Sequence, residues 1–169
     1  MTPSQDKRSI EVLTLTLQGE LFALEAGRVQ EILDQVPVTE VPGGSAFVSG
    51  LVNVRGKVVP LADLRLKFDM TPTSPTIDTR IVVIDVLVDG EMINVGLLAD
   101  KVHEVTELQA EVLEDTPRIG MRWRPELIRC IGKRGSDFIV VLDIDRVFEE
   151  GDQGTPVENP ISVPAQDAA

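Results

Sequence analysis

Alternation of apolar and polar residues is the sequence feature that most constrains the fold of this chain. Residues 10–24, 50–68, 80–102 and 128–143 each contain two runs of alternating character separated by glycine, asparagine or aspartate. Such runs, with turn residues between them, predict β-hairpins that bury one face. The chain is therefore predicted to be mainly β.

Two segments interrupt this pattern. In residues 25–33 the side chains of Val29, Ile32 and Leu33 are spaced for one face of a helix, which predicts a short helix there. Two prolines follow, which exclude a central strand and favour an edge segment. Residues 69–79 are rich in Thr and Pro and have no apolar period, so we expect a loop or hinge between two halves of the chain.

The two halves of the chain repeat one another. Each half contains a Gly-Glu turn, then a Val-x-Glu group, then an Arg-Gly turn followed by an aspartate and a phenylalanine. The first copy comprises Gly19–Glu20, Val29–Ile32, Arg55–Gly56, Asp63 and Phe68, and the second comprises Gly90–Glu91, Val102–Val105, Arg134–Gly135, Asp143 and Phe148. The similar spacing of the copies indicates a duplicated unit and hence two small β-barrels.

Charge and composition restrict the possible partners. The formal net charge of the 169 residues is −12, with 28 acidic residues against 16 basic ones, so the long-range field repels phosphate backbones and anionic lipids. We therefore expect no nucleic-acid partner and no direct membrane contact. A single cysteine, and no apolar run long enough for a secretory signal or a membrane span, predict a cytoplasmic protein.

Residues suited to catalysis or metal binding are scarce. His103 and Cys130 are the only histidine and cysteine, too few for a structural zinc site, so no metal, no cofactor and no catalytic residue is predicted. We expect His103 on a solvated strand face and Cys130 as a small apolar filler. Asp63 and Asp143 precede helical-looking stretches, where helix N-caps are the favoured interpretation. Trp123 fits either an interface anchor or a loop plug.

Arg55 lies at the crest of the hairpin expected in residues 50–68. A turn there needs Gly or Asn for positive φ, but it does not need an arginine. A guanidinium at such a crest is usually a solvated surface charge. Beside the apolar side chains and the glutamate of residues 29–33, however, it would be a bidentate donor next to an apolar strip, which is the kind of surface that anchors a protein partner.

The stretch GLVNVRGKVVPLADLRLKF, residues 50–68, resembles the signature of CheW-like chemotaxis coupling proteins, in which a Gly-x-x-Asn-x-Arg-Gly hairpin runs into Pro-x-x-Asp-Leu. The resemblance extends to RVQEIL at 28–33, where the family pattern has a helix, to VGLLADKVHEV at 95–105 and to LDIDRVF at 142–148. The order and spacing of the four segments agree with the family pattern.

This resemblance implies two five-stranded, SH3-like β-barrels packed side by side, with short helices. It also implies a non-catalytic adaptor that links the cytoplasmic hairpin tip of methyl-accepting chemoreceptors to the regulatory domain of the histidine kinase CheA, and that is recruited to receptor arrays. Carried over by position, the residues facing the receptor, in a groove between the barrels, are Val29, Glu31, Ile32, Arg55, Val102 and Val105. The residues facing the kinase are Val38, Val41 and Gly50.

The expected organisation is one CheW-like domain over residues 10–150, with two intertwined barrels. It is preceded by an extension, 1–9, and followed by an acidic tail, 151–169, that is predicted to be disordered because it offers little apolar surface to bury. The chain is too short to include a kinase or a receiver domain, so a free-standing adaptor is expected. The alternative is a small hydrolase that uses paired carboxylates in a concave pocket. A phospho-acceptor module would need an aspartate in an acidic cluster at strand ends, and the acids that end the strands here are isolated.

Overall fold

The computed structural model describes residues 9–40, 48–109, 113–114 and 124–154. The strands of this part are β1 (Ile10–Leu17), β2 (Glu20–Glu25), β3 (Val29–Leu33), β4 (Val38–Glu40), β5 (Val48–Val54), β6 (Lys57–Ala62), β7 (Arg80–Val88), β8 (Glu91–Ala99), β9 (Lys101–Leu108), β10 (Leu113–Glu114), β11 (Ile128–Arg134) and β12 (Asp137–Leu142). Its helices are α1 (Leu64–Lys67) and α2 (Ile144–Gly154), with the 3₁₀ turns η2 (Ala26–Arg28) and η4 (Pro125–Leu127).

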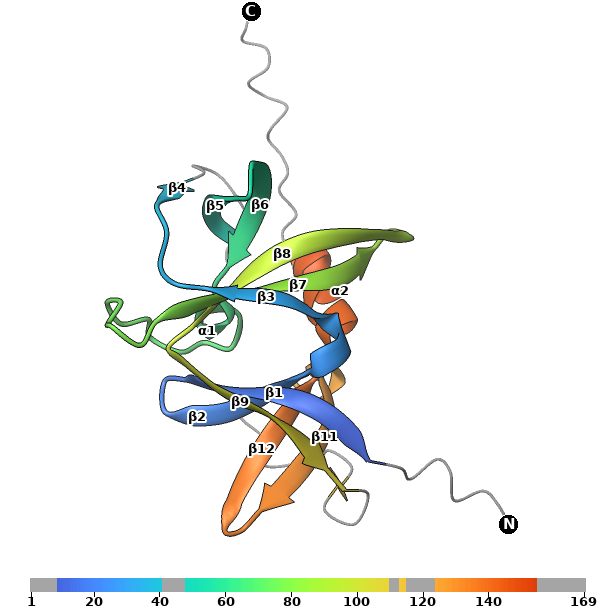
Figure 1. Cartoon of the computed structure of the whole chain (residues 1–169). Coiled ribbons are helices and arrows are strands. Elements are labelled where there is room, and N and C mark those ends of the chain that lie inside the picture. The colour runs from blue at the N-terminus through green and yellow to red at the C-terminus, as the bar shows by residue number, and fades with distance from the viewer. Residues whose placement is uncertain (1–8, 41–47, 110–112, 115–123, 155–169) are drawn as a thin grey trace, which may run out of the picture.

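The strands form two sheets, which lie one above the other in Figure 1. The sheet of the first barrel has the order β3-β7-β8-β6-β5-β4, and that of the second barrel the order β10-β11-β12-β2-β1-β9. In each barrel a hairpin from one half of the chain joins four strands from the other half. The mainly β fold with two barrel-like subdomains is confirmed, and short edge strands, β4 and β10, bring each sheet to six strands.

The sequence repeat has a counterpart in the strand pairing. β6 runs parallel to β8 in the first barrel, as β12 runs parallel to β2 in the second. Val29 on β3 lies opposite Ile84, and Val102 on β9 lies opposite Leu15. Along β3 the register shifts after Val29, and along β9 it shifts after Val102. Val29 and Val102 therefore occupy equivalent positions in the two barrels.

The prediction of a short helix in residues 25–33 is wrong. Only η2 is helical there, and β3 follows it directly. A bulge gives β3 one extra residue, because Val29 lies opposite Ile84 and Glu31 opposite Val83. The bulge breaks the period of two and spaces the apolar residues of β3 as a helix would space them.

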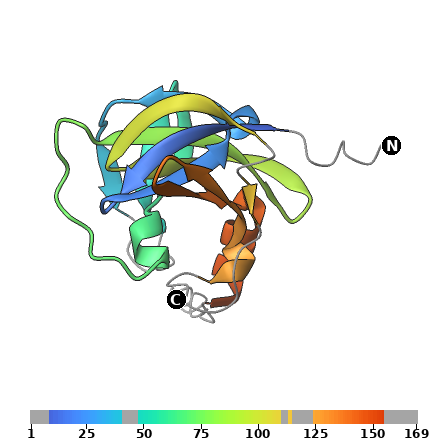
Figure 2. The ribbon, with the colours of Figure 1, turned by 90° about the horizontal axis from the view of Figure 1, so that it is seen from below.

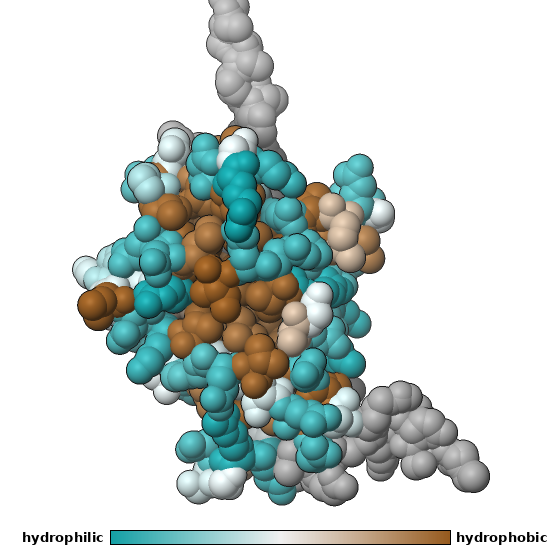
Figure 3. All heavy atoms as spheres, viewed as in Figure 1, coloured by the Kyte–Doolittle hydropathy of each residue, from teal (hydrophilic) through white to brown (hydrophobic). Residues whose placement is uncertain are grey.

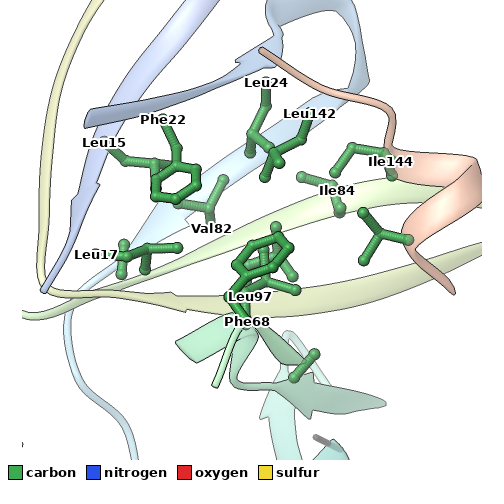
Figure 4. Packing of buried hydrophobic residues seen from close by; sticks show 14 of the residues in the cluster. Leu15, Leu17, Phe22, Leu24, Phe68, Val82, Ile84, Leu97, Leu142 and Ile144 are labelled. Atoms are coloured by element: carbon green, nitrogen blue, oxygen red, sulfur yellow. The ribbon is translucent and has the colours of Figure 1, made fainter. Parts of the chain in front are cut away.

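Three groups of buried apolar side chains hold the fold together. One belongs to the strands of the first barrel and another to those of the second. The third is a central core between the barrels, where the side chains of Leu15, Phe22, Val82 and Leu97 gather in Figure 4. Phe68, which ends α1, stacks on Phe22 with ring centroids 5.5 Å apart. The central core makes the two barrels one packed unit.

The aspartates before the helices act as expected. Oδ1 of Asp63 accepts a hydrogen bond from the backbone N of Arg65 at 3.0 Å, which caps α1. Oδ1 of Asp143 accepts one from the backbone N of Arg146 at 3.3 Å, at the start of α2. The N-cap interpretation is confirmed for both. Cys130 packs against the core of the second barrel, as a small apolar filler would.

Residues 69–79 contain no helix or strand, as expected of a connecting loop. Met70 is nevertheless buried in the central core. The carbonyl oxygen of Thr71 accepts a hydrogen bond from the side-chain amide of Gln18. The first residues of the loop are therefore held against the second barrel.

Helix α2 extends beyond the expected domain end at residue 150. Val147 is fully buried in the central core and docks the helix, which continues to Gly154. Residues 151–154 are thus helical, in contrast to the disorder expected for them. The rest of the expected tail, residues 155–169, lies outside the described residues, as does Trp123.

Candidate protein-docking site

Four of the residues expected to face a receptor form an apolar strip on the edge strands of the two barrels. Val29 and Ile32 lie on β3, and Val102 and Val105 lie on β9. Val29 and Val102 pack against the central core, whereas Ile32 is 43% and Val105 is 55% exposed. Figure 3 shows apolar side chains gathered at the centre of the face on which β3, β1 and β9 lie. The strip is therefore an exposed extension of the core.

The helices lie away from this strip. Figure 2 shows α1 (green) and α2 (red) on one side of the strands, while β1, β3 and β9 lie on the other. No helix of the described part covers the strip, and Ile32 and Val105 are exposed there.

Arg55 occupies the two-residue turn between β5 and β6. Its φ is +54° and that of Gly56 is +85°, so both turn residues have left-handed backbone, as a tight hairpin that follows the strand twist requires. Asn53 supports the turn, because its Oδ1 accepts a hydrogen bond from the backbone N of Gly56 at 2.9 Å. Glycine or asparagine would adopt the conformation of Arg55 more readily. Gln18 and Asp89 have similar φ values, +50° and +52°, in the β1–β2 and β7–β8 turns.

The guanidinium of Arg55 pairs with Glu31 on β3. Nε of Arg55 lies 3.0 and 3.3 Å from the two carboxylate oxygens of Glu31, and Nη2 lies 2.9 Å from Oε1. The hydrogen bond to Glu31 raises the pKa of Arg55. The side chain of Glu31 is 23% exposed and that of Arg55 78%. The pair ties the β5–β6 turn to β3 and leaves much of the guanidinium facing solvent.

The second barrel carries a corresponding pair. Nη2 of Arg134, the last residue of β11, lies 3.2 Å from Oε2 of Glu104 on β9. Glu104 follows Val102 in β9 as Glu31 follows Val29 in β3. One Arg–Glu pair therefore lies beside the strip on each barrel.

His103 is exposed and bonded to the neighbouring strand. Its Nε2 lies 2.7 Å from Oγ1 of Thr16 on β1. At the equivalent place in the first barrel, Nε2 of Gln30 donates to Oδ2 of Asp85 at 2.6 Å. The solvated strand position expected for His103 is confirmed, and the contact gives the imidazole a structural role between β9 and β1.

The residues expected to face the kinase differ in exposure. Val38 on β4 is 42% exposed. Gly50 on β5 is buried, and a Cβ built there would come within 2.6 Å of both the carbonyl oxygen of Thr39 and Cγ1 of Val38. Gly50 therefore lets β4 approach β5 and would influence a partner through the placement of β4. Val41 lies outside the described residues.

The hydrolase alternative finds no support. The pKa of Asp145 is lowered by its hydrogen bond with Arg28, which is the opposite of the raised pKa that a general acid needs. In the part of the chain that the structure describes, no three or more His, Cys, Asp or Glu residues gather as metal ligands would. No helix in this part has both the length and the apolar character needed to cross a bilayer.

The fold and the site define a protein-binding module built from two intertwined barrels. Residues 11–152 match the family model described as CheW-like domain. The chemotaxis protein CheW of Klebsiella aerogenes is 30% identical over 138 residues, which cover 82% of this chain and 81% of that protein. The chain belongs to the family of CheW-like chemotaxis coupling proteins.

Two further comparisons agree with this assignment. The chemotaxis protein CheW of Thermotoga maritima is 25% identical over 150 residues, covering 85% of this chain and 90% of that protein. The crystal structure of the scaffolding protein TtCheW from Thermoanaerobacter tengcongensis aligns with a TM-score of 0.73 and 27% identity, over 82% of this chain and 87% of that one. The two-barrel fold thus extends to a solved scaffolding protein.

The sequence identifies Glu31 and Arg55 as separate candidates, but it does not reveal that they pair. Glu104 and Arg134 are not singled out as site residues at all. The repeat contains the signal, because a Val-x-Glu group and an Arg-Gly turn occur in both halves. The partners are 24 residues apart in the first pair and 30 in the second, so only the strand arrangement brings them together.

Proposed function

We propose that this chain is a non-catalytic adaptor that couples chemoreceptors to a CheA-type histidine kinase at the cytoplasmic tips of the receptors. Its relatives are named chemotaxis proteins and its structural neighbour a scaffolding protein, which supports this function. The observation that carries the proposal is the apolar strip, which is exposed on both edge strands and backed by the central core.

A receptor hairpin tip would bury the exposed part of the strip. Ile32 and Val105 leave about half of their side chains in water. Removing apolar surface from water stabilises a complex by roughly 25 cal/mol per Å². A helical partner with apolar side chains on one face could cover β3 and β9 together, because helices commonly bind apolar surfaces in this way. Val29 and Val102 would support the contact from beneath.

The Arg55–Glu31 pair would fix the orientation of the partner. Glu31 already offsets part of the charge on Arg55, which reduces the cost of bringing the guanidinium into an interface. The exposed edge of the guanidinium can donate to a carboxylate or carbonyl oxygen of the partner. Arg55 would therefore contribute specificity beside the apolar contact.

The kinase regulatory domain would bind the first barrel through Val38 and Val41, with Gly50 holding β4 in place. β4 and β3 are the two outer strands in the order of the first sheet. Figure 1 shows β4 at the top of the molecule, apart from the strip. This separation would let receptor and kinase bind at the same time, as coupling requires.

Binding measurements with purified partners test this function. We expect the chain to bind the cytoplasmic fragment of a chemoreceptor and the regulatory domain of a histidine kinase from the same genome, and to form a three-component complex on size-exclusion chromatography. Ile32→Asp should weaken binding of the receptor fragment and leave the regulatory domain bound. Met92→Asp, at a side chain of similar exposure (57%) on the β7–β8 hairpin, is the matched control. Failure to bind either partner would refute the proposal.

A further inference from the structure

Two networks of ion pairs and hydrogen bonds brace the points where the strip-bearing strands begin. Each network joins the residue just before an edge strand to a neighbouring hairpin and to a helix from the other half of the chain. We call them the α1 brace, which contains Arg65 and Asp100, and the α2 brace, which contains Asp145 and Arg28.

The α1 brace precedes β9. The carboxylate of Asp100 accepts hydrogen bonds from the backbone N of Gln18 at 2.7 Å and from Nη1 of Arg65 at 2.8 Å. The backbone N of Asp100 donates to the carbonyl oxygen of Thr16 at 3.0 Å. Arg65 also reaches both carboxylate oxygens of Asp63 at 2.9 Å, and its side chain is only 5% exposed. Arg65 and Asp63 of this brace are buried, and the side chain of Asp100 is 25% exposed.

The α2 brace precedes β3. Nη2 of Arg28 lies 2.5 Å from Oδ2 of Asp145, and Nη1 donates to the carbonyl oxygen of Asp85 at 2.7 Å. Oδ1 of Asp145 accepts a hydrogen bond from the backbone N of Leu87 at 3.0 Å. The hydrogen bond between Arg28 and Asp145 raises the pKa of the arginine and lowers that of the aspartate. Asp145 thus holds β7 and the start of β3 together.

The two braces are equivalent, with their charges exchanged. Thr16 and Asp85 each follow the residue that pairs with the first strip valine. In the α1 brace the carboxylate precedes the edge strand and the arginine lies on the helix, whereas in the α2 brace the arginine precedes the strand and the carboxylate lies on the helix. The two braces therefore share the ion pair between the start of an edge strand and a helix, whichever of the two carries the arginine.

The braces differ in burial and in what lies next to them. The side chains of Arg28 and Asp145 are 24% and 34% exposed, whereas those of Arg65 and Asp100 are 5% and 25% exposed, so the difference lies mainly in the arginine. Arg28 is bonded directly to Val29 of the strip, whereas one residue, Lys101, separates Asp100 from Val102. Loosening the α2 brace should therefore move β3 while the core stays folded.

We propose that Arg28 and Asp145 are positioning residues for the partner of the apolar strip, and that through them α2 sets the placement of Val29 and Ile32. This inference rests on the proposed receptor-binding role of the strip. Asp145 does not have to touch the partner, since α2 lies on the opposite side of the strands from β1 and β9 (Figure 2). Arg28 would act through Val29, to which it is bonded.

The test compares Asp145→Asn with the double charge exchange Arg28→Asp and Asp145→Arg. Asp145→Asn keeps the size of the side chain and an acceptor for Leu87, but removes the charge that holds Arg28. We expect its affinity for a chemoreceptor cytoplasmic fragment to fall about tenfold, or 1.4 kcal/mol, and its affinity for the kinase regulatory domain to change less than about twofold. The double exchange restores the ion pair with the polarity of the α1 brace but loses the hydrogen bonds to Leu87 and to the carbonyl oxygen of Asp85, so it should recover only part of the affinity lost in Asp145→Asn.

Asp78→Asn is the matched control, because it also removes one carboxylate charge, at an exposed position in the 69–79 loop that belongs to neither brace. It should leave both affinities unchanged. Unchanged receptor affinity in Asp145→Asn would overturn the inference and leave the proposed function standing. A parallel loss of both affinities would overturn it as well, because the brace would then be structural only. If the wild-type chain binds no receptor fragment, the proposed function fails together with the inference.

Discussion

The two barrels reach the same Arg–Glu pairing by different local geometry. In the first barrel Arg55 is a turn residue with a left-handed backbone, and it makes three contacts of 2.9 to 3.3 Å with a largely shielded Glu31. In the second barrel Arg134 belongs to β11 and makes one contact of 3.2 Å with Glu104, which is 61% exposed. Both barrels have the Arg–Glu pair, and the pair of the first barrel has more contacts and a less exposed glutamate.

For the braces, the less exposed arginine is the one that supports the second barrel. The α1 brace, which supports β9 of the second barrel, has a buried arginine, and the α2 brace, which supports β3 of the first barrel, has a partly exposed one. In the first barrel the Arg–Glu pair is thus the better shielded of the two contacts beside the strip, and in the second barrel the brace is. The following substitutions separate these contributions.

Loss of the buried arginine should have the largest effect. Arg65→Ala leaves Asp63 and Asp100 buried or partly buried without their cation, and removing one partner of a buried pair costs about 3–5 kcal/mol of unfolding free energy. Arg28→Ala, in the more exposed brace, should cost about 1–2 kcal/mol. Urea unfolding followed by circular dichroism measures both. Equal losses would show that the two braces do not differ as their burial implies.

Charges placed in the strip should have the next largest effect. Ile32→Asp and Val105→Asp each bring a carboxylate into an apolar contact, at a cost of roughly 2 kcal/mol, which is about a 30-fold loss of receptor affinity. Both residues are already partly exposed, so the fold should survive. Titration calorimetry with a receptor cytoplasmic fragment measures the affinities. A loss in only one variant would mean that the partner contacts one barrel alone.

The hairpins and the helix caps can be predicted from the sequence, whereas β3 and the α2 brace cannot, for physical reasons. Turn glycines and alternation predict the hairpins, and the aspartates before α1 and α2 predict the caps, because these are local effects. β3 is mistaken for a helix because its bulge imitates a helical period. The α2 brace joins Arg28 to a residue 117 positions away, and no local pattern encodes that contact.

Replacing Arg55 and Arg134 one at a time should show how much each Arg–Glu pair contributes to assembly. Arg55→Ala should weaken the three-component complex about tenfold, because a partner group and Glu31 lose a geometrically fixed donor. Arg134→Ala should weaken it about twofold, as exposed pairs contribute little. Arg55→Lys should lie between wild type and Arg55→Ala, since it keeps the charge but not the fork. Sedimentation of the complex measures these effects, and a larger loss for Arg134→Ala would reverse the comparison.

The smallest effect concerns the pH dependence of the α2 brace. The folded-state pKa of Asp145 is lowered, so the ionised carboxylate stabilises the fold above its unfolded pKa of about 3.9, and this contribution is lost as the pH falls through the folded pKa. Wild type should therefore be more stable than Asp145→Asn at pH 7, and the difference should shrink below about pH 4. Thermal unfolding of both proteins across this range measures it. A difference that persists at pH 2 would show that the charge is not its source.

Receptor-dependent kinase activity tests the coupling function most directly. A histidine kinase and a chemoreceptor from the same genome, reconstituted in vesicles, would be assayed for autophosphorylation with increasing amounts of this chain. Wild type and Met92→Asp should raise the activity only when receptor is present, whereas Ile32→Asp should leave it at the level of the kinase alone. Equal activation by Ile32→Asp, or no response to the wild-type chain, would contradict an adaptor that acts through the strip on β3 and β9.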